Sequence, residues 1–289
     1  MSATVGLLHP GEMGACVGAT LVAGGARVRW ASAGRSAATR ARAEALGLED
    51  AGTVEAVART SDVVLAVVPP HGAFALARAV AAAGFRGLYV DANAVAPATA
   101  REIGRVVEAA GARFVDGGIV GPATRRPGTT RLYLAGAGAP EVAALFAAGP
   151  VEAIVLDGPP GAASALKVAY AAWNKGSQAL LAAVRAYAHA EGVAAALLAE
   201  WRRSMPDVPA RADRAVVDNA RKAWRFVGEM EEIARALAAV GLPTGFPEAA
   251  GEIYRRLAEY KDTPAPPPVA EALARLLAPE AAAPAARPR

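Results

Sequence analysis

The chain contains few of the cysteines and histidines that form disulfides or bind metal ions. Among its 289 residues it has one cysteine, Cys16, and three histidines. A single cysteine cannot form a disulfide within the chain, and its place in the first predicted helix favours a small core residue over a reactive thiol. No pair of cysteines or histidines stands at a spacing typical of metal ligands, so we predict no metal site.

Long apolar runs and blocks of like charge are also missing. No segment offers about 20 uninterrupted apolar residues, so we expect no membrane-spanning helix. The first apolar run comes directly after the start of the chain, without the charged and apolar regions of an export signal, and we expect a cytoplasmic protein. The net charge of +4 comes from scattered arginines without interleaved aromatic residues, a pattern that does not favour nucleic-acid binding.

The first half of the chain alternates apolar runs with alanine-rich helical segments. The runs with the character of β-strands are 4–8, 26–31, 62–68, 87–91 and 112–115, followed by a basic loop and a further strand at 132–136. This alternation predicts right-handed βαβ units and a parallel sheet that binds ligands at the carboxyl ends of its strands. Because 289 residues exceed the roughly 150 of a single-core domain, we also expect a second domain.

The first of these runs leads into the most informative turn of the chain. Residues 4–14 read TVGLLHPGEMG, a pattern typical of a strand, a tight turn and a helix start. Gly11 lets the backbone approach a bound group, and the N–H groups and dipole of the helix favour a pyrophosphate. The usual first glycine of G-x-G-x-x-G is His9 here, so an ordinary strand-to-helix turn remains the alternative. The cofactor-binding candidates of this turn are His9, Pro10, Gly11, Glu12 and Met13.

The end of the second strand indicates which dinucleotide binds. Sites for NAD usually place an acid there for the ribose hydroxyls, whereas a 2′-phosphate requires hydroxyl and guanidinium groups. This chain offers Ser32, Arg35 and Ser36, and the next acid in the chain, Glu44, lies inside the following helix. We therefore predict NADP(H) in preference to NAD. In the alternative interpretation, Arg35 is a solvated arginine of a basic helix surface.

Further candidates follow the third and fourth strands. The loop with Val68, Pro69 and Pro70 is predicted to cover the cofactor crevice, and His71 either touches the dinucleotide or lies on the surface. After the fourth strand, the Asn93 amide can hydrogen-bond a carboxamide or a substrate oxygen. The alternative for Asn93 is ordinary turn chemistry.

The segment 157–167, which runs into a long helical stretch through Ala190, carries the candidate catalytic group. Helical spacing places Lys167, Tyr170 and Asn174 on one face of this stretch. A lysine held near an apolar face and a cofactor can carry a proton during hydride transfer. A solvated surface lysine is the alternative interpretation.

Four segments in the same order resemble the β-hydroxyacid dehydrogenase family, which includes 3-hydroxyisobutyrate and 6-phosphogluconate dehydrogenases and is related to imine reductases. The resemblance covers about residues 4–260 and rests on the segments His9–Gly14, Asp91–Pro97, Asp116–Gly128 and Gly158–Lys167. It implies a Rossmann-type domain followed by an all-α C-terminal domain that often completes the active site of a neighbouring subunit. It also implies that Lys167 is the general acid in carbonyl reduction and the general base in alcohol oxidation.

Several positions depart from the family pattern and bear on the substrate. The family's S-G-G has become Val120-Gly121-Pro122, which removes a hydroxyl that helps to hold a carboxylate. The expected asparagine four residues after the lysine is Ala171, so Tyr170 or Asn174 would substitute for it. A Lys-Asp pair of the family is replaced by Gly228-Glu229. We therefore do not expect a simple 3-hydroxy acid as the substrate, although Ile119, Val120, Gly121 and Pro122 remain the predicted substrate loop.

The segment 222–232 offers two aromatic side chains, a guanidinium and several carboxylates. If it lines the cleft, Trp224 contacts a substrate that is bulkier or partly cationic. The alternative is an amphipathic core helix in which Trp224 and Phe226 are packed and the acids are solvated. The H-P-G-E-M-G turn together with this region most resembles a subgroup of the family with a distinctive C-terminal domain.

These observations predict an α/β Rossmann-type NADP-binding domain at 1–160, an all-helical substrate and dimerisation domain at 161–262, and a Pro/Ala-rich mobile tail at 263–289 with one candidate short helix at 269–277. Apolar helical faces in the second domain favour a homodimer. The leading functional prediction is an NADP(H)-dependent oxidoreductase acting on a carbonyl or hydroxyl group through Lys167. Imine reduction on the same scaffold and a non-catalytic dinucleotide-binding protein are the alternatives.

Overall fold

The computed structural model describes residues 3–278, which form two compact units that meet in the chain between Tyr170 and Ala171. This division falls ten residues after the expected boundary at 160/161. The reason is that helix α7 (Ala162–Ala190) begins against the sheet of the first unit and continues into the second without interruption.

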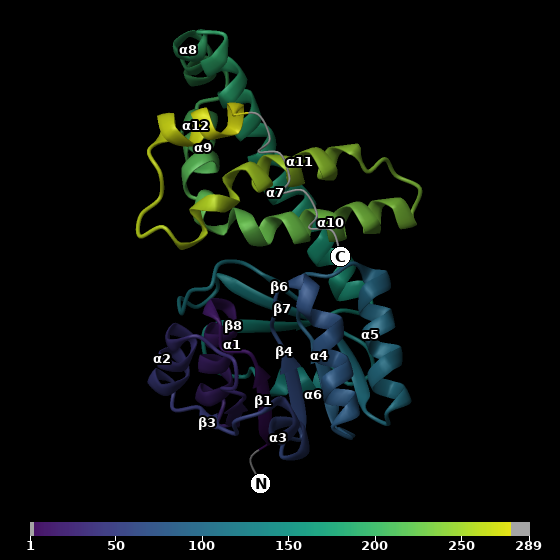
Figure 1. Ribbon diagram of the computed structural model, residues 1–289. Helices are drawn as coiled ribbons and strands as arrows, with labels where there is room; N and C mark the ends of the chain where they lie inside the picture. Colours follow the sequence, from purple (N-terminus) through teal and green to yellow (C-terminus); the bar gives the residue numbers. More distant parts are fainter. Residues whose placement is uncertain (1–2, 279–289) are drawn as a thin grey trace, which may run out of the picture. The chain divides into compact units, whose positions relative to one another are not determined.

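The first unit is built on an eight-stranded sheet (Figure 1). The strands are β1 Thr4–Leu8, β2 Arg27–Trp30, β3 Glu49–Asp50, β4 Val63–Ala66, β5 Leu88–Asp91, β6 Arg113–Val120, β7 Thr130–Ala135 and β8 Val151–Val155. Their order is β3-β2-β1-β4-β5-β6-β7-β8, and every pair is parallel except the antiparallel β6–β7. All six expected strands are present, and β3 and β8 are additional. The strand order reverses between β1 and β4, where a doubly wound sheet opens a crevice for ligands.

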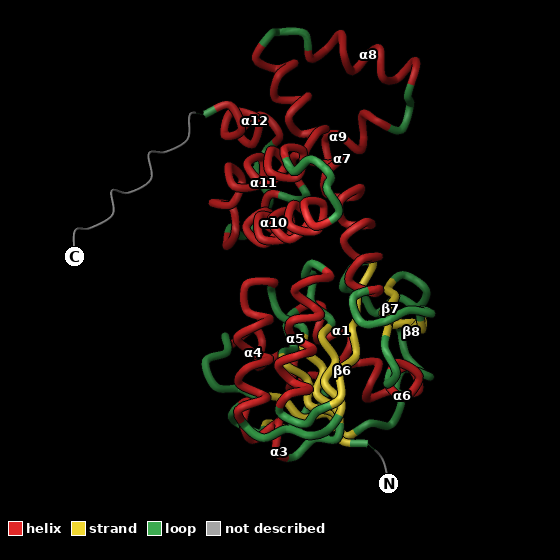
Figure 2. Tube along the Cα trace, turned by 90° about the vertical axis from the view of Figure 1, so that its right-hand side faces the viewer, coloured by secondary structure: helices red, strands yellow, loops and turns green. Residues whose placement is uncertain are grey.

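Helices cover both faces of this sheet, and Figure 2 shows α3, α4 and α5 together on one side. That layer consists of α3 Val54–Arg59, α4 Pro70–Ala82 and α5 Pro97–Ala109, while α1 Glu12–Ala23, α2 Ala37–Ala45 and α6 Ala139–Ala144 cover the other face. With both faces covered, β4 is buried at each of its four residues. Fully burying a leucine such as Leu65 contributes about 1.5–3 kcal/mol, so the central strands hold the site's scaffold firmly.

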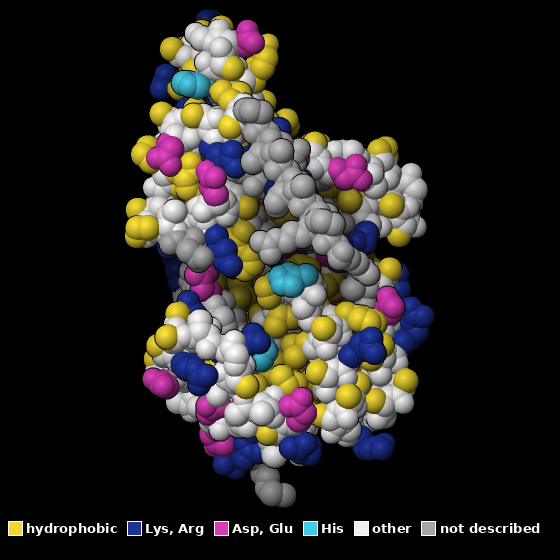
Figure 3. All heavy atoms as spheres, viewed as in Figure 1, with side chains coloured by type: hydrophobic (Ala, Val, Ile, Leu, Met, Phe, Trp, Pro, Cys, Tyr) yellow, Lys and Arg dark blue, Asp and Glu magenta, His cyan; other side chains and the backbone are white. Residues whose placement is uncertain are grey.

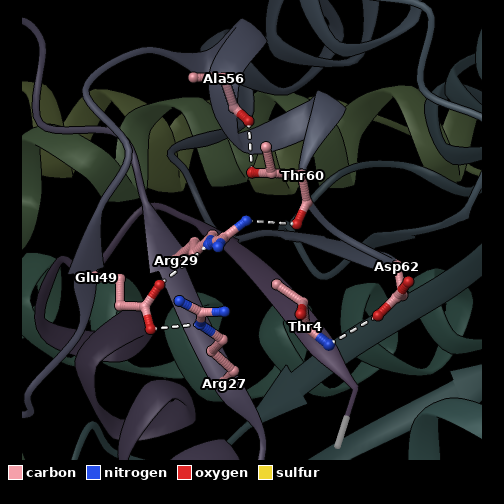
Figure 4. Close-up of polar contacts among 7 residues, drawn as sticks. All are labelled: Thr4, Arg27, Arg29, Glu49, Ala56, Thr60 and Asp62. Carbon is pink, nitrogen blue, oxygen red and sulfur yellow. Dashed lines mark hydrogen bonds and ion pairs between the residues drawn. The ribbon is translucent and has the colours of Figure 1, made fainter. Parts of the chain in front are cut away.

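Polar contacts fix the edge of the sheet at β2 and β3 (Figure 4). The Nε atoms of Arg27 and Arg29 donate to the two carboxylate oxygens of Glu49, at 2.5 and 3.1 Å. The Nη1 atom of Arg29 also donates to the Thr60 carbonyl at 2.9 Å. Ion pairs this exposed are screened by solvent and add little to stability, so their main effect is to link the short β3 to β2. Figure 3 shows basic and acidic side chains interspersed over the visible face of this unit.

The second unit is helical. Its elements after α7 are α8 Ala194–Ser204, α9 Val208–Val217, the 3-10 turn η1 Ala220–Lys222, α10 Ala223–Ala239, α11 Gly245–Leu257, the 3-10 turn η2 Ala258–Asp262 and α12 Val269–Leu277. The packing of α10 against α11 brings the Phe226 and Tyr254 rings edge to face at 5.2 Å. Met230 and Ile233 are buried beside them, which gives this unit a core of its own.

In the segment expected to be a mobile tail from residue 263, the short helix expected at 269–277 is present as α12, but it is docked on other helices. Within it, α12 contacts α9 and α11 and buries Ala272, Leu273 and Leu276. The short apolar stripe at helical spacing is sufficient to dock this helix. The part of the predicted tail at 279–289 lies outside the described residues. No helix within 3–278 is long and apolar enough to cross a membrane, and that range contains no cluster of side chains suited to a metal ion.

Candidate active site

The turn after β1 has an open backbone surface at the start of α1. The Gly11 amide donates to the His9 carbonyl at 2.8 Å, and α1 has no side-chain cap. A Cβ added at Gly14 would lie 1.9 Å from that same carbonyl oxygen, whereas one added at Gly11 would meet no atom within 4 Å. Gly14 is therefore required by the fold, and Gly11 leaves space over uncapped N–H groups, which fits a pyrophosphate.

His9 is buried in this turn and adds a second indication of a ligand. Its side chain is 6% exposed, and its Nδ1 atom has no hydrogen-bond partner within residues 3–278. Burial, reinforced by the charge of Arg35, lowers the pKa of His9 from 6.5 to about 4, against a hydrogen bond to the backbone of Ala31. At neutral pH the ring is uncharged, so it can face a dinucleotide as a neutral group with one ring nitrogen to be satisfied.

At the end of β2 the three predicted phosphate-binding residues differ in what they contact. Ser36 caps α2, accepting from the Thr39 amide at 3.3 Å. The Ser32 side chain is buried and hydrogen-bonds to Asp50, which together with other contacts lowers the pKa of that carboxyl. Arg35 remains exposed, so it is the group best placed to meet a 2′-phosphate.

Asp50 was not expected at this place. The sequence holds no acid between β2 and Glu44, but β3 pairs with β2 and brings Asp50 opposite Trp30, two residues before Ser32. The carboxylate that contacts Ser32 therefore comes from a strand that is two residues long.

Asn93 links the loops that follow β4 and β5. Its amide oxygen accepts from the Val68 N–H at 2.6 Å, and its amide nitrogen donates to the Asp91 carboxylate. Pro69 precedes α4 and Pro70 is the first residue of that helix, while His71 is exposed. Because the Asn93 oxygen is committed to Val68, the predicted contact with a carboxamide would have to use its second amide proton.

The start of α7 is capped by a buried carboxylate from β6. Asp116 is 0% exposed and accepts from the backbone amides of Gly161 and Ser164, at 2.8 and 3.0 Å. Its other oxygen accepts from the Ser164 hydroxyl at 2.5 Å. Burial raises the pKa of Asp116, and these hydrogen bonds oppose the rise. This charge at the N-terminus of the helix fixes where α7 begins.

Close backbone packing then places Lys167 beside β6. A Cβ added at Gly118 would lie 2.6 Å from the Ala163 carbonyl oxygen and 3.1 Å from the Cβ of Lys167. No other residue type fits at Gly118, because the helix backbone occupies that space. Lys167 is half-buried in this arrangement, at the level where β6 approaches the predicted substrate loop.

The predicted substrate loop is divided between the core and the surface. Ile119 and Val120 are buried in β6 and pair with β7. Gly121 has a φ of +116° and Pro122 is exposed, so the loop leaves the sheet at these two residues. The Pro122 carbonyl accepts from the Thr130 hydroxyl at 2.5 Å, which ties the loop to β7.

The other predicted site residues lie further along the chain. Tyr170 is exposed on α7, and the Asn174 amide oxygen accepts from Gln178 at 3.2 Å. Trp224 is half-buried, with the Lys261 ammonium 4.4 Å from the centre of its ring.

The core-helix alternative for residues 222–232 is correct for Phe226 and for the exposed Glu231, and wrong for Glu229 and Glu232. Phe226 is 8% exposed, as that alternative expects. The Glu229 carboxylate forms an ion pair with Lys175, and Glu232 is 4% exposed and paired with Arg235. Lys175 was not among the predicted site residues, and its ammonium also lies 4.9 Å from the Phe226 ring centre. No local signal could reveal this pair, because its members are 54 residues apart.

Parts of both units match families of known domains. Residues 3–145 match the NAD binding domain of 6-phosphogluconate dehydrogenase, and residues 188–257 match a domain of unknown function, DUF1932. The comparison with curated proteins found no match.

Solved structures similar to the chain extend over almost its whole length. The conserved protein MTH1747, of unknown function and described as similar to 3-hydroxyacid dehydrogenases, is 28% identical (89% of this chain, 98% of that chain, TM-score 0.65). A conserved hypothetical protein from Sinorhizobium meliloti 1021 is 27% identical (96% and 97%, TM-score 0.67). The Mycobacterium tuberculosis 3-hydroxyisobutyrate dehydrogenase is 20% identical (96% and 100%, TM-score 0.70) and shares the fold.

The matched NAD-binding domain confirms the predicted Rossmann-type fold, and a helical region follows it, as expected. The sheet order, the glycine turn and these similarities together place the chain in the β-hydroxyacid dehydrogenase family, whose members are NAD(P)-dependent oxidoreductases.

Proposed function

We propose that this protein is an NADP(H)-dependent oxidoreductase that interconverts a carbonyl and a hydroxyl group, with Lys167 as the general acid and base. The observation that carries the proposal is the fixed start of α7, where Asp116 and Gly118 hold the backbone around Lys167 against β6. A proton donor is effective only when its geometry is held by its surroundings.

The chain's own residues divide the work. His9, Gly11 and the first turn of α1 would hold the pyrophosphate, and Arg35 would select the 2′-phosphate. When bound, the nicotinamide supplies or accepts the hydride. In the direction of reduction, the Lys167 ammonium gives a proton to the oxygen as the carbonyl carbon is reduced, and in oxidation the neutral amine takes it back. Tyr170 or Asn174 would orient the substrate from the same face of α7.

The test begins with fluorescence titration of the purified protein with NADPH and NADH, followed by turnover assays on keto acids. Lys167→Ala should leave NADPH affinity unchanged and lower turnover at least about a hundredfold. Lys222→Ala, which removes an exposed lysine of the helical unit, is the matched control and should change neither. Unchanged turnover in Lys167→Ala would remove this residue from the mechanism.

Imine reduction is the competing chemistry on this scaffold, and the retained Lys167 favours carbonyl reduction over it. Assaying cyclic imines beside keto acids with the same enzyme decides between them. Binding of NADPH without turnover of either class would support the non-catalytic alternative.

We also propose that the protein is a homodimer that packs through the helical unit. Leu180 and Tyr187 lie seven residues apart on α7 and are 54% and 65% exposed, an apolar face that a second copy would cover. Light scattering should give twice the mass of the chain, and a monomer would contradict the proposal.

A further inference from the structure

The helical unit contains a cavity of about 370 Å³ between α7 and α9, within the size range of small-molecule sites. Trp173, Asn174 and Gln178 line it from α7, and Arg211 and Arg214 line it from α9. Every residue of its wall belongs to the helical unit. None of the residues that hold the predicted cofactor or the backbone around Lys167 takes part in it.

Positive charge dominates this wall. Arg211 and Arg214 stand one turn apart on α9, and both are exposed. Within residues 3–278 neither guanidinium is engaged in an ion pair or a side-chain hydrogen bond. Asp218 is the acid of the wall, so two guanidiniums against one carboxylate leave a net charge of +1. Guanidinium groups that the protein does not itself neutralise are suited to a planar anion.

A row of side-chain amides forms another part of the wall. The Asn219 amide nitrogen donates to Gln178 at 2.6 Å and to the Ala215 carbonyl at 3.2 Å. Gln178 in turn donates to the oxygen of Asn174 at 3.2 Å. This relay commits the Asn174 oxygen, so the amide nitrogen of Asn174 is the group that can meet a ligand. The relay therefore adds an oriented donor to those of the two arginines.

Beside these donors lies a large apolar surface. The Trp173 side chain is 72% exposed at the cavity, and Leu181 adds an aliphatic wall. An exposed indole next to hydrogen-bond donors is typical of a site for a ligand with a flat apolar part and a polar end.

We infer that this cavity binds a small carboxylate that carries a planar apolar group. Arg211 and Arg214 bind the carboxylate, the Asn174 amide donates to it, and the Trp173 ring packs against the apolar part. The inference does not depend on hydride transfer, because the cavity lies wholly in the helical unit, although it shares Asn174 with the residues proposed to orient the substrate. Such a carboxylate is either part of the substrate or a separate effector.

The test is calorimetric titration of the full-length protein with benzoate, using benzamide as the neutral probe of equal shape. Benzoate should bind at least about tenfold more tightly than benzamide, because only the anion pairs with the guanidiniums. The double variant R211Q/R214Q should lose at least about tenfold in benzoate affinity while its thermal unfolding stays unchanged. R202Q/R203Q, which removes two exposed arginines of α8, is the matched control and should bind benzoate normally.

Three results would overturn the inference: no benzoate binding to the folded protein, equal binding of benzamide, or undiminished binding by R211Q/R214Q. Binding of inorganic phosphate in place of benzoate would overturn the carboxylate assignment. Once turnover is established, competition of benzoate with the substrate identifies a substrate subsite, and non-competitive inhibition identifies an effector site. Benzoate binding by a protein that fails to bind NADPH would leave this inference standing while the proposed function falls.

Discussion

Two helices that begin in the first unit, α1 and α7, differ in what meets the N–H groups of their first turn. The start of α1 has Gly11 and no side-chain cap, whereas that of α7 is capped by the buried Asp116 carboxylate. A helix start that is filled from within cannot accept an external anion, and one that is left open can. We therefore propose that α1 binds the cofactor and that α7 positions Lys167, so changes at the two starts should affect different measurements.

Asp116→Ala should have the largest effect on stability. It leaves the Gly161 and Ser164 amides and the Ser164 hydroxyl without their acceptor, at a cost of about 4 kcal/mol. Urea unfolding measures this loss, with Asp157→Ala, which removes an exposed acid, as the control. The milder Asp116→Asn should lower kcat while NADPH affinity is kept. If NADPH affinity fell instead, the assignment of α7 to placement of Lys167 would be wrong.

Acid should weaken the α1 turn through His9. The folded protein holds this ring neutral because burial lowers its pKa to about 4, whereas the unfolded chain takes up the proton near pH 6.5. Stability is therefore complete above about pH 6.5 and decreases by about 3 kcal/mol as the pH falls to about 4. Urea unfolding of His9→Gln between pH 7 and 4 should lack this decrease. The control His71→Gln, at an exposed position, should retain it.

Substitutions at two glycines of the α1 turn should affect stability and NADPH affinity separately. Gly14→Ala places a methyl group 1.9 Å from the His9 carbonyl oxygen and should destabilise the protein by about 2 kcal/mol. Gly11→Ala has open space around its methyl group, so stability should stay within about 0.5 kcal/mol of wild type. NADPH affinity should nevertheless fall at least about tenfold in Gly11→Ala, because the pyrophosphate can no longer approach the backbone. Normal binding by this variant would show that the open start of α1 is not the phosphate site.

The smallest expected effect concerns the choice of dinucleotide. Arg35→Ala should weaken NADPH about tenfold, or about 1.4 kcal/mol, and change NADH affinity much less. Arg59→Ala, an exposed arginine at the end of α3, is the control in the same fluorescence titration. Equal weakening of both nucleotides would contradict a contact between Arg35 and the 2′-phosphate.

The sequence predicted the elements that carry a strong local pattern. Residues 4–8 form β1 with the predicted bounds, and all the other expected strands are present. The two-residue β3 was missed because it is too short to show a period, and the edge strand β8 because it is only partly buried.

Contacts between distant residues could not be predicted in the same way. Lys167 was identified from helical spacing and family resemblance, but its placement depends on Asp116, which lies 48 residues before its partner Ser164. The contact of Asp50 with Ser32 arises from the pairing of β3 with β2. Contacts of this kind depend on how distant segments of the chain come together in the fold, and no local sequence pattern predicts them.

The single cysteine gives the first unit an internal reporter. Cys16 is buried in α1, and its thiol donates to the carbonyl of Thr124, in the loop that leaves β6, at 2.7 Å. Burial also raises the pKa of this thiol, which makes it slow to react with alkylating reagents. Because no other cysteine competes for the label, the rate of Cys16 alkylation should follow how often the 121–129 loop lifts from α1, with and without a bound substrate.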